Sequence, residues 1–272
     1  MYGAILGDII GSVFEFDLGP WTKEFELLTE ESDWTDDTVM TVAVAEALLE
    51  AGKDAAAEEI EAACTRSMRK WGRKYPRAGY GGRFYTWLVS ENPKPYGSYG
   101  NGSAMRVSAA GWLYDSMERT REAARATAMP THDHPEGIKG AECTAAVIFL
   151  ARTGSSKTEI REYVEREFGY DLSETIEEMR ARHEHVESCQ DSLPKALVSF
   201  LAGTDFEDVI RNAVSLGGDT DTIAAIAGAM AEGMYGVPSE LKEQARKRLE
   251  AGMVEVLDRF ELYASFASKN QR

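Results

Sequence analysis

Two short acidic segments lie far apart in the chain, and each precedes an apolar stretch typical of a helix. They are residues 35–38 (TDDT) and residues 217–222 (GGDTDT). Each could simply cap its helix, because Thr and Asp accept hydrogen bonds from the first backbone N–H groups and carboxylates complement the helix dipole. For either segment alone, capping is the simpler interpretation.

Taken together, the two segments predict a metal site. They offer four carboxylates and two hydroxyls, from Asp36, Asp37, Asp219 and Asp221 with Thr35 and Thr222. Four carboxylates balance two divalent cations, and hard cations such as Mg²⁺ or Mn²⁺ accept oxygen ligands of these kinds. Two helix N-termini would otherwise repel cations, so cations and an anionic ligand are expected to share the site. The alternative is two independent helix caps.

A glycine-rich segment, residues 96–106 (YGSYGNGSAMR), has the features of a phosphate cradle. Its closely spaced glycines allow backbone N–H groups to line up toward a phosphate, although most such loops are plain turns. A helix is expected to start at Ser103. Arg106 in its first turn could either bind phosphate or pair with an Asp of the acidic segments, and both roles stay open.

Two of the four histidines lie in residues 131–135 (THDHP), and the simplest interpretation is a turn that begins a helix before Glu136. A zinc pair is not expected, because soft ligands are missing. His183 and His185 fall in the charged segment 173–189, which is expected to form a helix that faces solvent.

The elements that must position these residues are helices, since helical periodicity dominates and alternating β-branched runs are rare. We predict an all-α fold, a single compact multi-helix domain over residues 1–272. Residues 75–102, rich in Pro, Gly, Tyr and Asn, are expected to be mainly loop. Helices are expected over residues 2–17, 36–51, 54–71, 103–117, 120–129, 136–153, 156–168, 173–189, 193–202, 205–214, 220–235, 239–251 and 253–267.

The first expected helix, residues 2–17, has two features of its own. Gly3, Gly7 and Gly11 are spaced four apart and form a bare ridge that another helix can approach closely. Asp8 and Glu15 are seven apart, so two helical turns would place both carboxylates on one face.

Composition limits the functional classes. Thirty basic against 46 acidic residues give a net charge of −16, so nucleic acid is not an expected partner. Cys64, Cys143 and Cys189 form no CxxC pair, which predicts neither a disulfide framework nor a zinc knuckle and favours a cytoplasmic location. No apolar stretch reaches the ~20 residues of a membrane span, and no leader with a cleavage site is recognisable. A monomer is expected.

Five segments, in the same order, resemble the signature segments of the ADP-ribosylglycohydrolases. They are residues 7–15 (GDIIGSVFE), 34–40 (WTDDTVM), 96–106, 131–135 and 215–236 (SLGGDTDTIAAIAGAMAEGMYG). The family includes the dinitrogenase reductase-activating glycohydrolases and the ADP-ribosyl-acceptor hydrolases. The likeness spans residues 1–236, and the pairing of the two acidic segments is its most specific part.

The resemblance implies an all-α fold with two Mg²⁺ or Mn²⁺ ions, held by Thr35, Asp36, Asp37, Asp219, Asp221 and Thr222. It places Glu15 at the position of the family's catalytic glutamate, with Asp36 and Asp219 as catalytic partners. It also implies that the glycine-rich loop, residues 97–103, wraps the ADP-ribose diphosphate and distal ribose with His132 nearby. That loop consists of Gly97, Ser98, Tyr99, Gly100, Asn101, Gly102 and Ser103.

The function that the resemblance implies is hydrolysis at C1″ of ADP-ribose, which removes ADP-ribose from an arginine or serine side chain of a protein or from a small acceptor. The alternative is a catalytically inactive ADP-ribose-binding protein of the same fold, and the intact Glu15 and acidic pairs argue against it. A class I terpenoid synthase would need an acid at Met40, and an HD-type phosphohydrolase would need a histidine before His132.

Overall fold

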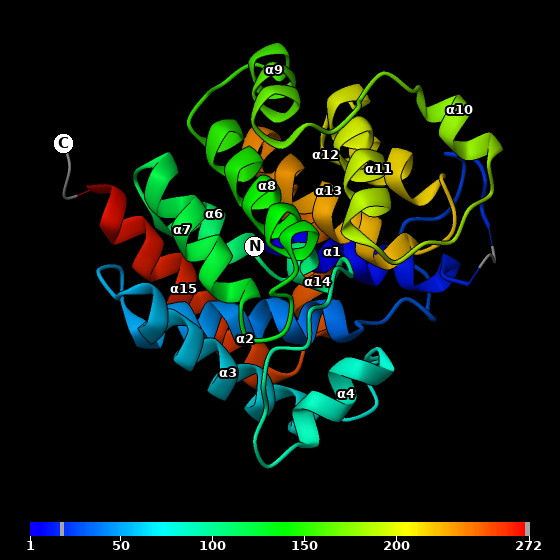
Figure 1. Ribbon diagram of the computed structural model, residues 1–272. Coiled ribbons are helices and arrows are strands. Elements are labelled where there is room, and N and C mark those ends of the chain that lie inside the picture. The colour runs from blue at the N-terminus through cyan, green and yellow to red at the C-terminus, as the bar shows by residue number, and fades with distance from the viewer. Residues whose placement is uncertain (17–18, 270–272) are drawn as a thin grey trace.

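The computed structural model describes residues 1–16 and 19–269, and within these residues it consists of helices without a β-strand (Figure 1). This confirms the predicted fold class. None of the described helices is long and apolar enough to cross a bilayer. The elements are α1 (Tyr2–Gly11), the 3₁₀ turn η1 (Ser12–Phe14), α2 (Asp36–Ala51), α3 (Ala57–Lys74), α4 (Gly82–Val89), α5 (Gly102–Met105), α6 (Ser108–Leu113), α7 (Met117–Ala128), α8 (Pro135–Arg152), α9 (Lys157–Phe168), α10 (Ile176–Ala181), α11 (Cys189–Ala202), α12 (Phe206–Val214), α13 (Thr220–Tyr235), α14 (Ser239–Arg248) and α15 (Ala251–Lys269).

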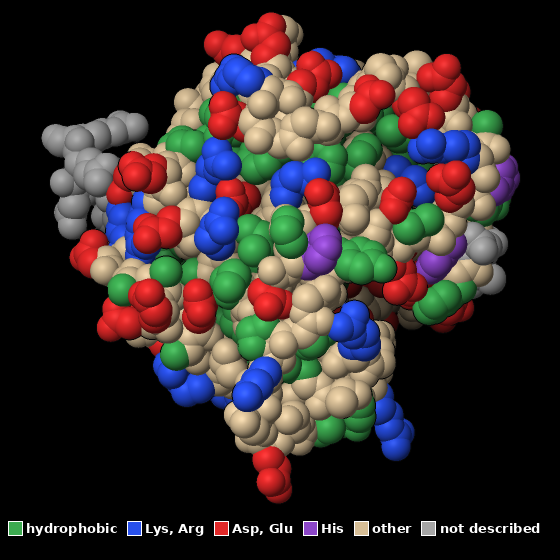
Figure 2. Space-filling model, in the orientation of Figure 1, with side chains coloured by type: hydrophobic (Ala, Val, Ile, Leu, Met, Phe, Trp, Pro, Cys, Tyr) green, Lys and Arg blue, Asp and Glu red, His purple; other side chains and the backbone are tan. Residues whose placement is uncertain are grey.

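Helix α13 runs through the centre of the molecule, and α1, α8, α11 and α12 pack against it (Figure 1). Both α1 and the first three turns of α13 are buried, as expected for helices that are apolar on every side. The buried apolar side chains form one continuous core that includes residues of nearly every helix. On the surface shown in Figure 2, acidic and basic side chains are interspersed and form no continuous basic patch among the described residues.

The glycine ridge of α1 packs directly on the backbone of α13, as predicted. A Cβ added to Gly3, Gly7 or Gly11 would lie 2.2, 2.0 or 2.4 Å from a backbone oxygen, that of residue 228, 224 or 220 respectively. Because the partner residue number falls as the glycine number rises, the two helices run antiparallel. This register places the end of α1 beside the start of α13, where the second acidic segment lies.

The prediction of one helix over residues 2–17 was wrong at its end. Helix α1 ends at Gly11, η1 follows, and Glu15 has an extended backbone with φ −58° and ψ 161°. The hydroxyl of Thr220 donates to the Gly11 carbonyl at 2.8 Å, an oxygen that a continuing helix would use itself. Asp8 and Glu15 therefore do not share a helical face, and residue 17 lies outside the described residues.

The prediction of loop over residues 75–102 missed α4. This helix buries Phe84, Trp87 and Leu88, at the i, i+3 and i+4 spacing of one helical face. The glycines before it and the prolines after it confine the helix to two turns. The composition of the region as a whole therefore predicts a loop.

Two further helices are shorter than predicted. The helix expected over 103–117 is interrupted at Arg106, between α5 and α6. Of the charged segment 173–189, α10 is helical and residues 183–188 are not, so His183 and His185 do not lie on a helix. This stretch pairs with the glycine-rich loop instead, since Asn101 N donates to Glu187 O at 2.9 Å and Cys189 N donates to Tyr99 O at 2.9 Å.

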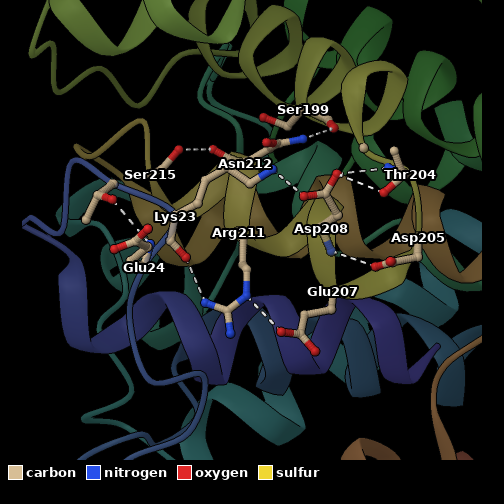
Figure 3. Close-up of polar contacts among 12 residues, drawn as sticks. Lys23, Glu24, Ser199, Thr204, Asp205, Glu207, Asp208, Arg211, Asn212 and Ser215 are labelled. Carbon is tan, nitrogen blue, oxygen red and sulfur yellow. Dashed lines mark hydrogen bonds and ion pairs between the residues drawn. The ribbon is translucent and has the colours of Figure 1, made fainter.

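The loop that connects Glu15 to α2 is tied to α12 (Figure 3). The Arg211 guanidinium donates from Nη1 to the carbonyl oxygens of Lys23 and Phe25, each at 2.8 Å, and Lys23 pairs with Asp208. Arg211 Nε in turn donates to Glu207 Oε1 at 2.8 Å, which also fixes the guanidinium. The described part of this loop thus follows a fixed path across the molecule before it enters α2.

Candidate active site

The two acidic segments come together in the fold. The hydroxyl of Thr222, in the first turn of α13, donates to Asp37 Oδ2 at 3.1 Å, and Thr35 Oγ1, at the start of α2, lies 3.4 Å from Asp221 Oδ2. These contacts cross 185 and 186 positions of sequence. The structure thus joins the two helix N-termini through reciprocal pairs of hydroxyl and carboxylate.

Asp8 of α1 holds the start of α2. Its fully buried carboxylate accepts hydrogen bonds from the backbone N–H of Thr35 and Thr38, at 3.0 and 2.9 Å, and from Thr35 Oγ1 at 2.8 Å. Thr35 is also the N-cap residue of α2 and accepts from Asp37 N at 3.3 Å. The capping interpretation therefore holds for Thr35, and Asp8 adds a second cap that the sequence did not reveal.

Asp219 does not cap its helix, although it occupies the N-cap position of α13. Its Oδ2 accepts a hydrogen bond at 2.5 Å from the amide of Asn101, on the glycine-rich loop. Ligand oxygens of Glu15, Asp219 and Asp221 lie within 4.8 Å of one another and are candidates to hold a cation. For Asp219, the alternative of an independent helix cap is therefore not supported.

We call Glu15, Asp36, Asp37, Asp219 and Asp221 the acidic centre. In the described structure none of these carboxylates forms a salt bridge with Lys or Arg, and Asp37 Oδ1 is buried without a hydrogen-bond partner. Burial, followed by the negative charge of Asp221, raises the pKa of Glu15 to about 8, and burial raises the pKa of Asp219 to about 6. Burial and neighbouring carboxylates also raise the pKa of the three others well above the usual range.

The acidic centre lines a cavity of about 390 Å³, within the size range of small-molecule sites. Four residues of the glycine-rich loop line it: Ser98, Gly100, Asn101 and Gly102. Two hydrogen bonds fix the start of the loop. Asp133 Oδ1 accepts from Gly97 N at 2.6 Å, and Thr131 O accepts from Ser98 N at 3.3 Å.

The other three residues of the loop do not line the cavity. The hydroxyl of Ser103 is buried and donates to Gly137 O at 2.7 Å. Tyr99 is half-exposed beside His134, with 5.3 Å between ring centroids. Gly97 takes φ +63°, a backbone conformation that favours glycine, and makes the turn that leads into the loop.

The two histidines of residues 131–135 have separate roles. His134 is the N-cap of α8 and accepts from Glu136 N at 3.2 Å, so the predicted helix-initiating turn is present. His132 is buried and lines the cavity, and burial together with the positive charges of Arg106 and Arg83 lowers the pKa of its imidazole well below the usual range.

Arg106 also lines the cavity and is fully buried, without a hydrogen bond or ion pair to an Asp among the described residues. The predicted pairing of Arg106 with an acidic segment is therefore not formed. Its other predicted role, phosphate binding, stays a prediction.

The sequence did not reveal several residues that line the cavity. Phe16, Arg83 and Glu187 line it, from three different segments. Gly79 lines it as well, and a Cβ there would be 3.1 Å from Asp36 Oδ1. The only signal in the sequence was the group of glycines at residues 79–82, whereas Glu187 lay in a stretch predicted to be a solvent-facing helix.

Fold and site together define an all-helical protein with buried carboxylates in the wall of a small-molecule cavity, the class to which helical hydrolases belong. A model of the ADP-ribosylglycohydrolase family matches residues 1–271, so the chain belongs to this family of glycohydrolases.

Similar proteins agree with this assignment. ADP-ribosylhydrolase ARH3 from Homo sapiens is 30% identical, over 86% of this chain and 84% of its own length. ADP-ribosylarginine hydrolase Tri1 from Pseudomonas putida (strain GB-1) is 26% identical, over 91% of this chain and 72% of its own. Among solved structures, an ADP-ribosylglycohydrolase-related protein complex shares the fold with a TM-score of 0.67 and 24% identity, over 98% of this chain and 93% of its own.

Proposed function

We propose that this protein is a divalent-cation-dependent hydrolase that cleaves the glycosidic bond at C1″ of ADP-ribose. The family supports a glycohydrolase that removes ADP-ribose, and the names of the two relatives, ADP-ribosylhydrolase and ADP-ribosylarginine hydrolase, agree with it. The proposed acceptor is an arginine or serine side chain of a modified protein, or a small molecule. The observation that carries the proposal is the convergence of the two acidic segments in the wall of one cavity.

The acidic centre fits two Mg²⁺ or Mn²⁺ ions. Buried carboxylates that have no cationic partner among the described residues, with an unpartnered Asp37 Oδ1 among them, are the donor set that hard divalent cations require. The proposed ligands are Thr35, Asp36, Asp37, Asp219, Asp221 and Thr222. When bound, such cations supply Lewis-acid stabilisation of oxygen and lower the pKa of water.

Glu15 is the proposed proton-transfer residue, with Asp36 and Asp219 as its catalytic partners. Its carboxyl group lines the cavity beside Asp219 and Asp221, where a positioned side chain can transfer a proton to or from a bound substrate or water. A positioned carboxyl group can exchange a proton with water or with the leaving group and stabilise positive charge on the ribose.

The glycine-rich loop is the proposed site for the diphosphate and distal ribose. Four of its residues line the same cavity as the acidic centre, and Asn101 joins the loop to that centre through its hydrogen bond to Asp219. Arg106 and Arg83 also line the cavity and add positive charge to it, which suits an anionic ligand.

The test compares arginine-linked and serine-linked ADP-ribosyl peptides, with and without a chelator, and measures free ADP-ribose. We expect release that the chelator abolishes, and loss of release in Asp219→Ala and in Asp221→Ala with nearly unchanged helicity. Asp54→Ala removes an exposed carboxylate outside the cavity and serves as the matched control. Full activity in either variant would contradict the assignment, and binding of ADP-ribose without turnover would indicate an inactive binding protein.

A further inference from the structure

Arg106, Thr131 and His132 form a buried hydrogen-bond chain along one wall of the cavity. Their exposed fractions are 1%, 0% and 4%. Arg106 Nη2 donates to Thr131 Oγ1 at 2.8 Å, and Thr131 Oγ1 lies 2.7 Å from His132 Nδ1. Because a guanidinium can only donate, Thr131 is the acceptor on the arginine side, and its single hydroxyl proton is free to point at the histidine.

This chain selects among the three protonation states of His132. If Nδ1 carried the proton, both neighbours would donate to Thr131 Oγ1 and the buried hydroxyl proton would lack an acceptor among the described residues, which costs a hydrogen bond. If both ring nitrogens were protonated, a second buried positive charge would lie one hydroxyl away from Arg106. The remaining state is the neutral imidazole with its proton on Nε2. Its unprotonated Nδ1 accepts a hydrogen bond from the Thr131 hydroxyl.

The second ring nitrogen faces the glycine-rich loop. A Cβ added to Gly102 would lie 3.2 Å from His132 Nε2, and one added to Gly100 would lie 3.7 Å away. His132, Gly100 and Gly102 all line the cavity, and within the described structure Nε2 has no hydrogen-bond partner. Two glycines therefore leave this N–H uncovered, so that it is available to a ligand.

We propose that Arg106 and Thr131 are positioning residues that hold His132 as the neutral tautomer with its proton on Nε2. His132 then donates a hydrogen bond into the cavity, to an acceptor oxygen of the ligand, and does not serve as a base. The identity of the ligand rests on the proposed function, whereas the tautomer does not. Burial and the charges of Arg106 and Arg83, which lower the pKa of His132, agree with a neutral ring.

The tautomer is measured by NMR on the full chain without ligand, with ¹⁵N-labelled histidine near pH 7. We expect a protonated-type signal from Nε2 of His132 and an unprotonated, acceptor-type signal from its Nδ1, assigned by their loss in His132→Gln. His134 accepts a backbone N–H at Nδ1 and is an internal reference for the signal of an acceptor-type Nδ1. A protonated Nδ1 on His132, in a neutral or a charged ring, would overturn the proposal.

Three variants then test the chain. Thr131→Val removes the hydroxyl and should give a mixture of tautomers, whereas Thr131→Ser should retain the Nε2–H form. Thr127→Val is the matched control, because its buried hydroxyl donates to Ala124 O and does not contact His132. An unchanged tautomer in a folded Thr131→Val protein would refute the role of Thr131, and if this variant does not fold, the measurement on the unmodified protein decides.

Activity gives a separate result. We expect Thr131→Val to lower kcat/KM for release of ADP-ribose about ten-fold, the scale of one hydrogen bond, and Thr131→Ser to restore it. Equal kcat/KM in Thr131→Val and the unmodified protein would contradict a hydrogen-bonding role for His132. If the NMR result holds but the unmodified protein releases no ADP-ribose, the proposed function fails and the tautomer assignment stands.

Discussion

Replacing Gly7 by alanine tests the close crossing of α1 and α13. The new Cβ would lie 2.0 Å from the carbonyl oxygen of Ala224 and 2.2 Å from its carbonyl carbon. Both are backbone atoms, so no side-chain rotation relieves the clash. Real Cβ contacts almost never fall below 3.0 Å, and α1 and α13 must therefore separate by about 1 Å.

The expected cost follows from two opposing effects. Overpacking a buried contact costs about 1–3 kcal/mol, and here rigid backbone places it at the upper end. The higher helix propensity of alanine relative to glycine offsets up to about 1 kcal/mol of this destabilisation. The remainder, about 2 kcal/mol, lowers the Tm by about 4–8 °C in a chain of this size. Because Asp8 follows directly in sequence, its hydrogen bonds to Thr35 and Thr38 should also weaken, and Mn²⁺ affinity should fall with them.

The assay is calorimetric unfolding of Gly7→Ala beside Gly252→Ala. Gly252 also lies in a helix, α15, but a Cβ there would meet its nearest atoms, on Lys74 and Trp71, at 3.4 and 3.7 Å, which is ordinary contact. We expect this control variant to be unchanged or slightly stabilised. A Gly7→Ala protein as stable as the control would refute the helix crossing described above.

Three other predictions concern the cavity. Because burial raises the pKa of Asp8 and of Asp219 to about 6, above their unfolded values, the cation-free protein should lose stability as pH rises from about 5 to about 7. Excess Mn²⁺ should reduce this loss, and a Tm in chelator that rises over the same range would show the reasoning to be wrong. Asn101→Ala removes the amide that orients Asp219 and should weaken Mn²⁺ binding about ten-fold in calorimetry with little change in Tm; unchanged affinity would exclude this orienting role. Gly102→Ala places a methyl group 3.2 Å from His132 Nε2 and should raise KM for an ADP-ribosyl peptide while the fold is retained, and an unchanged KM would mean that this nitrogen does not face the ligand.

The sequence predicted those features whose signal is local. The acidic segments carry helix-start signals next to apolar runs, and the glycines of α1 repeat at helical spacing, so α2, α13 and the close approach of α1 were all predictable. The role of Asp8 as a cap of α2 was not, because its partners lie 27 and 30 positions away. Only packing brings those groups together.

Other features depend on tertiary contacts that override local preference. Residues 183–188 have the charged composition of an exposed helix, yet their backbone is not helical, and Glu187 O and Cys189 N bond to the glycine-rich loop instead. Arg83 and Glu187 line the cavity from separate segments that carry no shared motif. Glu15 was singled out by its motif and lines the cavity, although it lies beyond the end of α1 rather than on it.

The hydroxyl–carboxylate pairs between α2 and α13 have a consequence for the timing of activity during synthesis. Asp37 meets Thr222 only after α13 has begun to leave the ribosome, so a nascent chain that stops short of α13 cannot assemble the acidic centre. Activity thus requires the folded tertiary structure that includes α13. A chain truncated before α13, or a partly folded intermediate, should be inactive even where α1 and α2 have formed.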